Sequence, residues 1–261
     1  MRQGALAGIA YSARGDGAPV VCLHGIGADS TSFAHQMGAF PGFRVIAWNM
    51  PGYGGSPPEE PMTFAGLSER LARFIEAKGA ERVHLVGQSM GGMIALEHAC
   101  RHPAQVASLA LVATTARFGG RDDSFKEAFL KARLAPLAAG ETMAEMARAA
   151  APQLVGPKTQ KDEISRIAEA MARVSETTWR SVLKCLVTFD RAHDLASIDV
   201  PALLVAGSED RNAPARTMEK MANRMPNAQF HELEGAGHMV HQEMPERFNA
   251  LLLEFLKRFM H

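Results

Sequence analysis

The sequence predicts an α/β protein with a mainly parallel sheet. Short runs rich in valine, leucine and isoleucine alternate with segments whose apolar residues recur at helical spacing. Several of these runs are hydrophobic throughout, which is typical of strands that are covered on both faces. Alternating strands and helices indicate parallel pairing, because each crossover helix returns the chain to the same end of the sheet.

Five runs predict buried strands, and a sixth, in which polar and apolar residues alternate, predicts a weaker one. In chain order they span residues 19–24, 43–49, 82–87, 106–113, 202–207 and 229–233. Three segments predict helices, because their apolar residues lie three and four positions apart. They span residues 64–78, 90–101 and 244–259, and Pro103 ends the second.

The stretch from 117 to 190 breaks this alternation. It reads as helical sequence, with segments rich in alanine, methionine and glutamate, and it has no run typical of a strand. Two ordinary crossover helices would explain it, but one crossover rarely needs a stretch this long. We therefore expect residues 1–116 and 191–261 to form the core and residues 117–190 to form an inserted helical cap.

Composition narrows the class of protein. The 261 residues carry 28 Lys and Arg against 28 Asp and Glu, so the net charge is zero and the basic footprint of a nucleic-acid binder is missing. The sequence has neither the apolar core of a signal peptide nor a run of about 18 apolar residues. We expect a cytoplasmic protein that acts on a small molecule, with no nucleic-acid or membrane partner. Its oligomeric state is left open.

Three cysteines without a CxxC spacing argue against a disulfide framework. They are Cys22, Cys100 and Cys185. Cys22 and Cys100 lie in apolar stretches, where small buried packing residues are the simplest interpretation.

Residues 87–91 read G-Q-S-M-G, which matches the G-x-S-x-G motif. A predicted strand precedes the motif and a predicted helix follows it, so Ser89 would lie on a strained turn above the sheet. Gly87 and Gly91 would let the two backbones approach each other. Ser89 could instead only cap the helix, but the combined context favours a nucleophile that is activated by a base.

Two backbone groups are candidates for an oxyanion hole. The first turn of the helix after Ser89 has unpaired N–H groups and a partial positive charge, so we expect the N–H of Met90 to be one donor. Residues 24–27 read H-G-I-G after the first predicted strand, and we expect the N–H of Ile26 to be the other donor. This loop could also be a plain turn, and His24 is expected to be structural.

His238 lies in a glycine loop between the last predicted strand and the last predicted helix, where a base could reach Ser89. His241 is the nearest rival and is expected to face elsewhere. The two histidines could bind a metal, but no HExxH motif or carboxylate cluster supports a metal site. Asp210 follows a strand end and is the expected acid partner of His238, with Glu209 as an alternative. Asp210 could also be a turn residue.

The chain order Ser89, Asp210, His238 is the order of α/β-hydrolases. Together with N-M-P-G-Y-G-G-S at residues 49–56 and G-S-E-D at residues 207–210, these motifs resemble the α/β-hydrolase superfamily over nearly the whole chain. The resemblance implies a mainly parallel eight-stranded sheet flanked by helices, a helical cap after the sixth strand, and one or two edge strands within residues 4–14. The family pattern has aspartate at position 49, where this chain has Asn49, so we expect altered loop hydrogen bonds.

The chain is most similar to the esterase, enol-lactonase and carbon–carbon hydrolase group of that superfamily. Haloalkane dehalogenases and epoxide hydrolases place aspartate where this chain has Ser89, which disfavours an alkyl-enzyme. We expect a serine hydrolase that cleaves a small carboxylic ester or lactone through an acyl-enzyme, without metal or organic cofactor. The alternatives are carbon–carbon hydrolysis of a ring-cleavage diketone, perhydrolysis, and a non-catalytic ligand receptor. Six side chains could line an apolar pocket, although each also suits core packing: Met90, Met93, Phe125, Phe129, Trp179 and Phe189.

Overall fold

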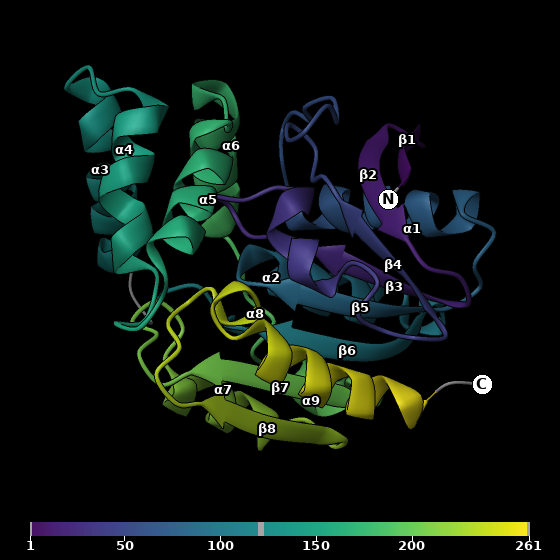
Figure 1. The fold of residues 1–261 in the computed structure, drawn as a ribbon. Coiled ribbons are helices and arrows are strands. Elements are labelled where there is room, and N and C mark those ends of the chain that lie inside the picture. Colours follow the sequence, from purple (N-terminus) through teal and green to yellow (C-terminus); the bar gives the residue numbers. More distant parts are fainter. Residues whose placement is uncertain (1, 120–122, 260–261) are drawn as a thin grey trace.

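A computed structural model describes residues 2–119 and 123–259 and contains an eight-stranded sheet with helices on both faces (Figure 1). The expected eight-stranded α/β sheet is therefore confirmed. Its strands are β1 Arg2–Leu6, β2 Ile9–Arg14, β3 Ala18–Leu23, β4 Phe43–Trp48, β5 Val83–Gln88, β6 Val106–Val112, β7 Ala202–Gly207 and β8 Ala228–Leu233. The core and cap ranges predicted from the sequence also include residues 1, 120–122 and 260–261, which lie outside the described residues.

The strand order is β1-β2-β4-β3-β5-β6-β7-β8. β1 pairs antiparallel with β2, and β2 pairs antiparallel with β4. All the other neighbours are parallel. Because parallel strands end at the same edge, the loops after β3, β5, β7 and β8 meet there.

Both faces of the sheet are buried. Along β3, Val21 and Leu23 pack on one face while Val20 and Cys22 pack on the other, as the side-chain period of two requires. One face is covered by α1 (Phe64–Ala77), α2 (Met90–Arg101) and α7 (Ala215–Ala222). The other is covered by the 3-10 helix η1 (Ser30–Gln36), α8 (Val240–Glu243) and α9 (Pro245–Lys257).

Two helical segments differ from expectation. The predicted helix 244–259 corresponds to α9 alone, and a separate short helix, α8, precedes it across a break at Met244 (φ −130°, ψ 57°). Pro245 explains the break, because a proline disfavours helical backbone in the residue before it. We did not predict α7 from the sequence, because its eight residues are too few to show a helical period.

Within the described residues, four α-helices lie between β6 and β7 and gather at one end of the sheet (Figure 1). Their bounds are α3 Ser124–Ala138, α4 Met143–Ala150, α5 Lys161–Ala172 and α6 Glu176–Leu186. An isolated bridge joins Arg117 to Asp190, at the two ends of the predicted cap. A small apolar cluster between α4 and α5 includes Ala147, Ile167 and Met171. The division into core and cap remains our proposal. In the described part of the chain, every helix is too short or too polar to cross a membrane.

Candidate active site

Ser89 lies on the turn that joins β5 to α2. Its backbone has φ 53° and ψ −121°, in the left-handed half of conformational space that a side chain makes costly. Hydrogen bonds to the neighbouring strand hold this conformation, because the Ser89 N–H donates to the Val112 carbonyl at 2.9 Å and the Thr114 hydroxyl donates to the Ser89 carbonyl at 2.7 Å. The Ser89 side chain makes no capping hydrogen bond. The hydroxyl is thus not used as a simple helix cap.

Glycines allow this turn to pack tightly. A Cβ at Gly91 would collide with the carbonyl oxygen of Leu23, and a Cβ at Gly87 would collide with that of Gly91. The helix that follows Ser89 can therefore lie directly against β3 and β5, as the spacing of the two glycines predicts.

His238 and Asp210 come together from the loops after β8 and β7. The Nδ1 atom of His238 lies 2.8 Å from Oδ2 of Asp210, and both side chains are buried. The other oxygen of Asp210 accepts hydrogen bonds from the N–H groups of Asn212 (2.8 Å) and Ala213 (3.0 Å). Burial alone would raise the pKa of Asp210, but His238 and these two N–H groups outweigh it and lower the pKa below its usual value.

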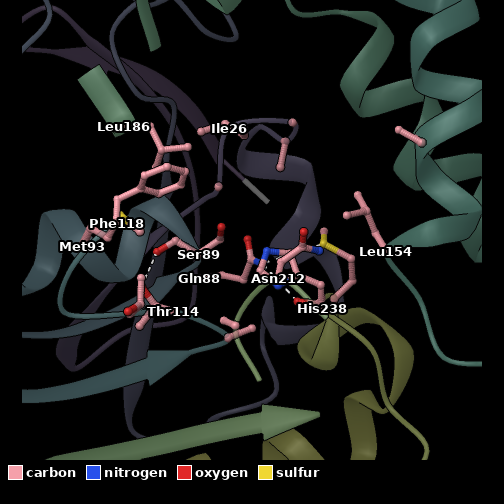
Figure 2. A pocket seen from close by; sticks show the side chains of 18 of the residues that line it. Ile26, Gln88, Ser89, Met93, Thr114, Phe118, Leu154, Leu186, Asn212 and His238 are labelled. Atoms are coloured by element: carbon pink, nitrogen blue, oxygen red, sulfur yellow. Dashed lines mark hydrogen bonds between the residues drawn. The ribbon is translucent and has the colours of Figure 1, made fainter. Parts of the chain in front are cut away.

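Ser89 and His238 line the same cavity, which has a volume of about 260 Å³ (Figure 2). No hydrogen bond joins the two side chains in the part of the chain that the structure describes. The hydrogen bond between a nucleophile and its base is often long in the absence of substrate and shortens when the substrate binds. The arrangement can therefore support nucleophilic chemistry with His238 as the base.

Both expected oxyanion donors have free N–H groups. Within residues 2–119 and 123–259, neither the N–H of Ile26 nor that of Met90 donates to a protein acceptor. Ile26 lines the cavity, and the Tyr53 hydroxyl fixes its loop by donating to the Ile26 carbonyl at 2.8 Å. The same loop is packed against Gln88 and Ser89, because a Cβ at Gly25 would lie 2.6 Å from Oε1 of Gln88 and 3.1 Å from the Cβ of Ser89.

His24 has a structural role in this loop. Its Nε2 atom accepts the Met50 N–H at 3.0 Å, so Nδ1 carries the hydrogen and donates to the Gly25 carbonyl at 2.8 Å. Burial lowers the pKa of His24 to about 4, although the Gly25 hydrogen bond and Asp29 oppose the shift. His24 is therefore a neutral side chain that links two loops at the edge of the sheet.

The rival residues lie elsewhere. His241 is fully buried, with its ring centroid 4.8 Å from that of Phe33, and it does not line the cavity. Glu209 is exposed, and in the described part of the chain it is Asp210, not Glu209, that is hydrogen-bonded to the His238 ring. Among the described residues, no three histidine, cysteine, aspartate or glutamate side chains are grouped as metal ligands would be.

Two further residues position His238, and the sequence reading missed both. The Gln88 side chain donates to the His238 carbonyl at 3.1 Å. Glu243 accepts hydrogen bonds from the N–H groups of Gly237 and Met239, both at 3.0 Å, on either side of the histidine. Its carboxylate also accepts from the Gly156 N–H at 2.6 Å and the Thr159 hydroxyl at 2.8 Å. Glu243 thus ties the His238 loop to the helical segment between β6 and β7.

The rest of the cavity is mainly apolar. Four of the six side chains proposed for a pocket line it, namely Met93, Phe125, Phe129 and Trp179. Met90 and Phe189 do not line it and are core residues.

Asn49 replaces the family's aspartate without breaking its loop. Its Oδ1 accepts the Ser30 N–H at 2.8 Å, and its Nδ2 donates to the Gly54 carbonyl at 3.1 Å. A carboxylate could not donate this second bond. The expected change in loop hydrogen bonding is therefore present.

Comparisons with known proteins agree with this architecture. The model of the alpha/beta hydrolase fold family matches residues 18–245. The chain is 30% identical to pimeloyl-[acyl-carrier protein] methyl ester esterase of Neisseria meningitidis, over 91% of this chain and 92% of the relative. It is 30% identical to 2-hydroxy-6-oxononadienedioate/2-hydroxy-6-oxononatrienedioate hydrolase of Burkholderia vietnamiensis, over 92% and 87%. A thermophilic esterase from Thermogutta terrifontis superimposes with a TM-score of 0.88 at 25% identity, covering 97% of this chain and 94% of that one. The chain therefore belongs to the alpha/beta hydrolase fold family and is a hydrolase.

Proposed function

We propose that this hydrolase cleaves a small carboxylic ester or lactone through an acyl-enzyme on Ser89. The observation that carries the proposal is that Ser89 and His238 line one cavity while His238 is hydrogen-bonded to Asp210. A serine hydroxyl is a weak nucleophile that needs an adjacent base, and an oriented histidine is the commonest one.

In the proposed reaction His238 accepts the proton of Ser89 as the hydroxyl oxygen attacks the carbonyl carbon. The N–H groups of Ile26 and Met90 stabilise the negative oxygen of the tetrahedral intermediate. His238 then protonates the leaving alcohol, and the C–O bond breaks to give the acyl-enzyme. In the second half His238 takes a proton from water as the water oxygen attacks the acyl carbon. His238 then returns the proton to the Ser89 oxygen as the C–O bond breaks, which releases the acid and free Ser89. Asp210 stabilises the imidazolium in both halves.

The test is a comparison of Ser89→Ala with the wild-type enzyme on an activated ester. We expect kcat to fall by about 10⁶-fold, as when other triad serines are removed, while the far-UV circular dichroism stays unchanged. Ser197→Ala is a matched control, because Ser197 is exposed and lies outside the cavity. Undiminished turnover by Ser89→Ala would overturn the proposal.

A second candidate function is the hydrolysis of a carbon–carbon bond in a ring-cleavage diketone. It is supported by the 30% identity to the Burkholderia vietnamiensis relative, which is named a hydrolase of 2-hydroxy-6-oxononadienedioate and 2-hydroxy-6-oxononatrienedioate. The same histidine and serine could serve both reactions. Steady-state kinetics on para-nitrophenyl butyrate, a small lactone and a vinylogous diketone would rank the two functions by kcat/KM.

A further inference from the structure

The cavity that contains Ser89 carries positive charge and no opposing carboxylate. Of the side chains that line it, Arg133 and Arg211 are cationic. Within the described residues no aspartate or glutamate lines it. Ion pairs are stronger in a mainly apolar cavity than in water, because little solvent screens them. These walls suit an anionic group better than a neutral or cationic one.

Arg133 is unusual among the arginines of the helical segment between β6 and β7. Five others form ion pairs: Arg117 with Asp190, Arg166 with Glu163, Arg173 with Asp29, Arg180 with Glu176 and Arg191 with Glu97. Arg148, which forms no ion pair within the described residues, is exposed. In the described part of the chain, the Arg133 guanidinium has no acidic partner and no side-chain hydrogen bond. The guanidinium lies over the Phe129 ring, with its central carbon 5.3 Å from the ring centroid.

Arg133 is half-buried, so its lack of a partner costs free energy. Burial lowers the pKa of Arg133 below its usual value, which means that the surroundings disfavour the charge. A carboxylate at this position would remove the penalty, because a guanidinium can bind both carboxylate oxygens at once.

Arg133 lies away from the reacting atoms. Besides the catalytic cavity, it lines two neighbouring hollows, and neither of them includes Ser89 or His238. A group bound to Arg133 would therefore occupy the end of the substrate remote from the bond that is cleaved. The walls of this cavity include apolar side chains, among them Phe118 and Leu186 (Figure 2).

We propose that Arg133 binds a carboxylate of the substrate, so that this hydrolase prefers esters or lactones with an acid group remote from the scissile carbonyl. The inference rests on the proposed ester hydrolysis at Ser89. Arg133 binds the anionic group, and the apolar side chains of the cavity contact the carbon chain that connects this group to the carbonyl.

The test compares paired substrates that differ only in charge. One pair is the half para-nitrophenyl ester of adipic acid and its terminal carboxamide, with the acid on the acyl side. The other pair is the acetate ester of 6-hydroxyhexanoic acid and its carboxamide, with the acid on the alcohol side. In at least one pair the wild type should prefer the carboxylate by about 10-fold or more in kcat/KM, as expected for hydrogen bonds to a charged group. Arg133→Gln should lose this preference, because its kcat/KM on the carboxylate ester should fall toward its kcat/KM on the carboxamide.

Two variants complete the design. Arg148→Gln is the matched control. Arg148 is exposed on α4 and does not line the cavity, so the variant should keep the preference. Arg133→Lys keeps the positive charge but not the forked guanidinium, so it should keep part of the preference. It tests the inference if Arg133→Gln fails to fold.

Three results would overturn the inference: no preference in the wild type, a preference that survives in Arg133→Gln, or an equal loss on both members of each pair. If the wild type hydrolyses none of the four esters, the proposed function fails separately. Calorimetric titration of adipate into the wild type and Arg133→Gln would then still decide the binding claim. Adipate should bind at least about 10-fold more weakly to the variant, and equal affinities would overturn the claim.

Discussion

Replacing His241 with leucine should make the protein more resistant to acid. The ring is enclosed between Phe33 and Phe248. Burial, together with the charges of His35 and His238, lowers the pKa of His241 to about 3, and a hydrogen bond with the Ser32 backbone opposes the shift only in part. The folded protein thus keeps this ring neutral at a pH where the unfolded chain protonates it.

The magnitude follows from the two pKa values. The pKa of a histidine in the unfolded chain is about 6.5, above the value of about 3 in the folded protein, so the unfolded chain binds the proton first as the pH falls. The contribution of the neutral His241 ring to the free energy of unfolding is fully present above about pH 6.5 and is lost as the pH falls toward about 3. At about pH 5 the unfolded side chain is about 1.5 pH units below its pKa. At about 1.4 kcal/mol per unit, protonation then favours unfolding by about 2 kcal/mol.

The assay is urea unfolding of both proteins at about pH 7 and about pH 5, followed by circular dichroism. Wild type should lose about 2 kcal/mol more than His241→Leu between the two pH values. The change in packing caused by leucine does not depend on pH, so it cancels in this difference. Replacing the exposed His193 with glutamine controls for the loss of one histidine. Equal losses in the wild type and His241→Leu would refute the reasoning.

Three further substitutions test the candidate site. Gly25→Ala places a Cβ 2.6 Å from the Gln88 side-chain oxygen, so it should displace the loop that carries the Ile26 N–H. A lost oxyanion donor lowers kcat by about 10²- to 10³-fold, and an unchanged kcat would contradict this role. Asp210→Asn should lower kcat by about 10⁴-fold in steady-state assays, because the amide cannot stabilise the imidazolium. A loss below about 10-fold would count against it. Glu243→Gln removes a carboxylate that accepts three backbone N–H groups, which should cost about 2 kcal/mol and lower the Tm by about 4–8 °C in a thermal scan. An unchanged Tm would show that these bonds are not stabilising.

The interior strands could be predicted closely from the sequence because they are buried on both faces. β7 begins and ends where the apolar run does, and β3 to β6 differ from their runs by about one residue at either end. The edge strand β1 and its neighbour β2 are partly exposed, and only the family resemblance indicated them. The eight residues of α7 were missed, because three buried residues within little more than one turn are too few to define a period.

The positions of Ser89, Asp210 and His238 were predictable because each follows a strand in a local motif. The residues that hold them in place were not, since their contacts join distant parts of the chain. Gln88 reaches His238 across 150 positions, and Glu243 reaches Gly156 across 87. Whether the Arg133 guanidinium forms an ion pair was equally unpredictable, because the sequence does not show which acidic residues lie near it.

The most direct test of Ser89 as the nucleophile is covalent labelling with a fluorophosphonate. This reagent is attacked by an activated serine, and tryptic digestion with mass spectrometry locates the adduct. We expect one phosphonyl group on the peptide that contains Ser89, formed rapidly by the wild type and far more slowly by Asp210→Asn. Rapid labelling at another residue, or no labelling of the active wild-type enzyme, would contradict the central claim.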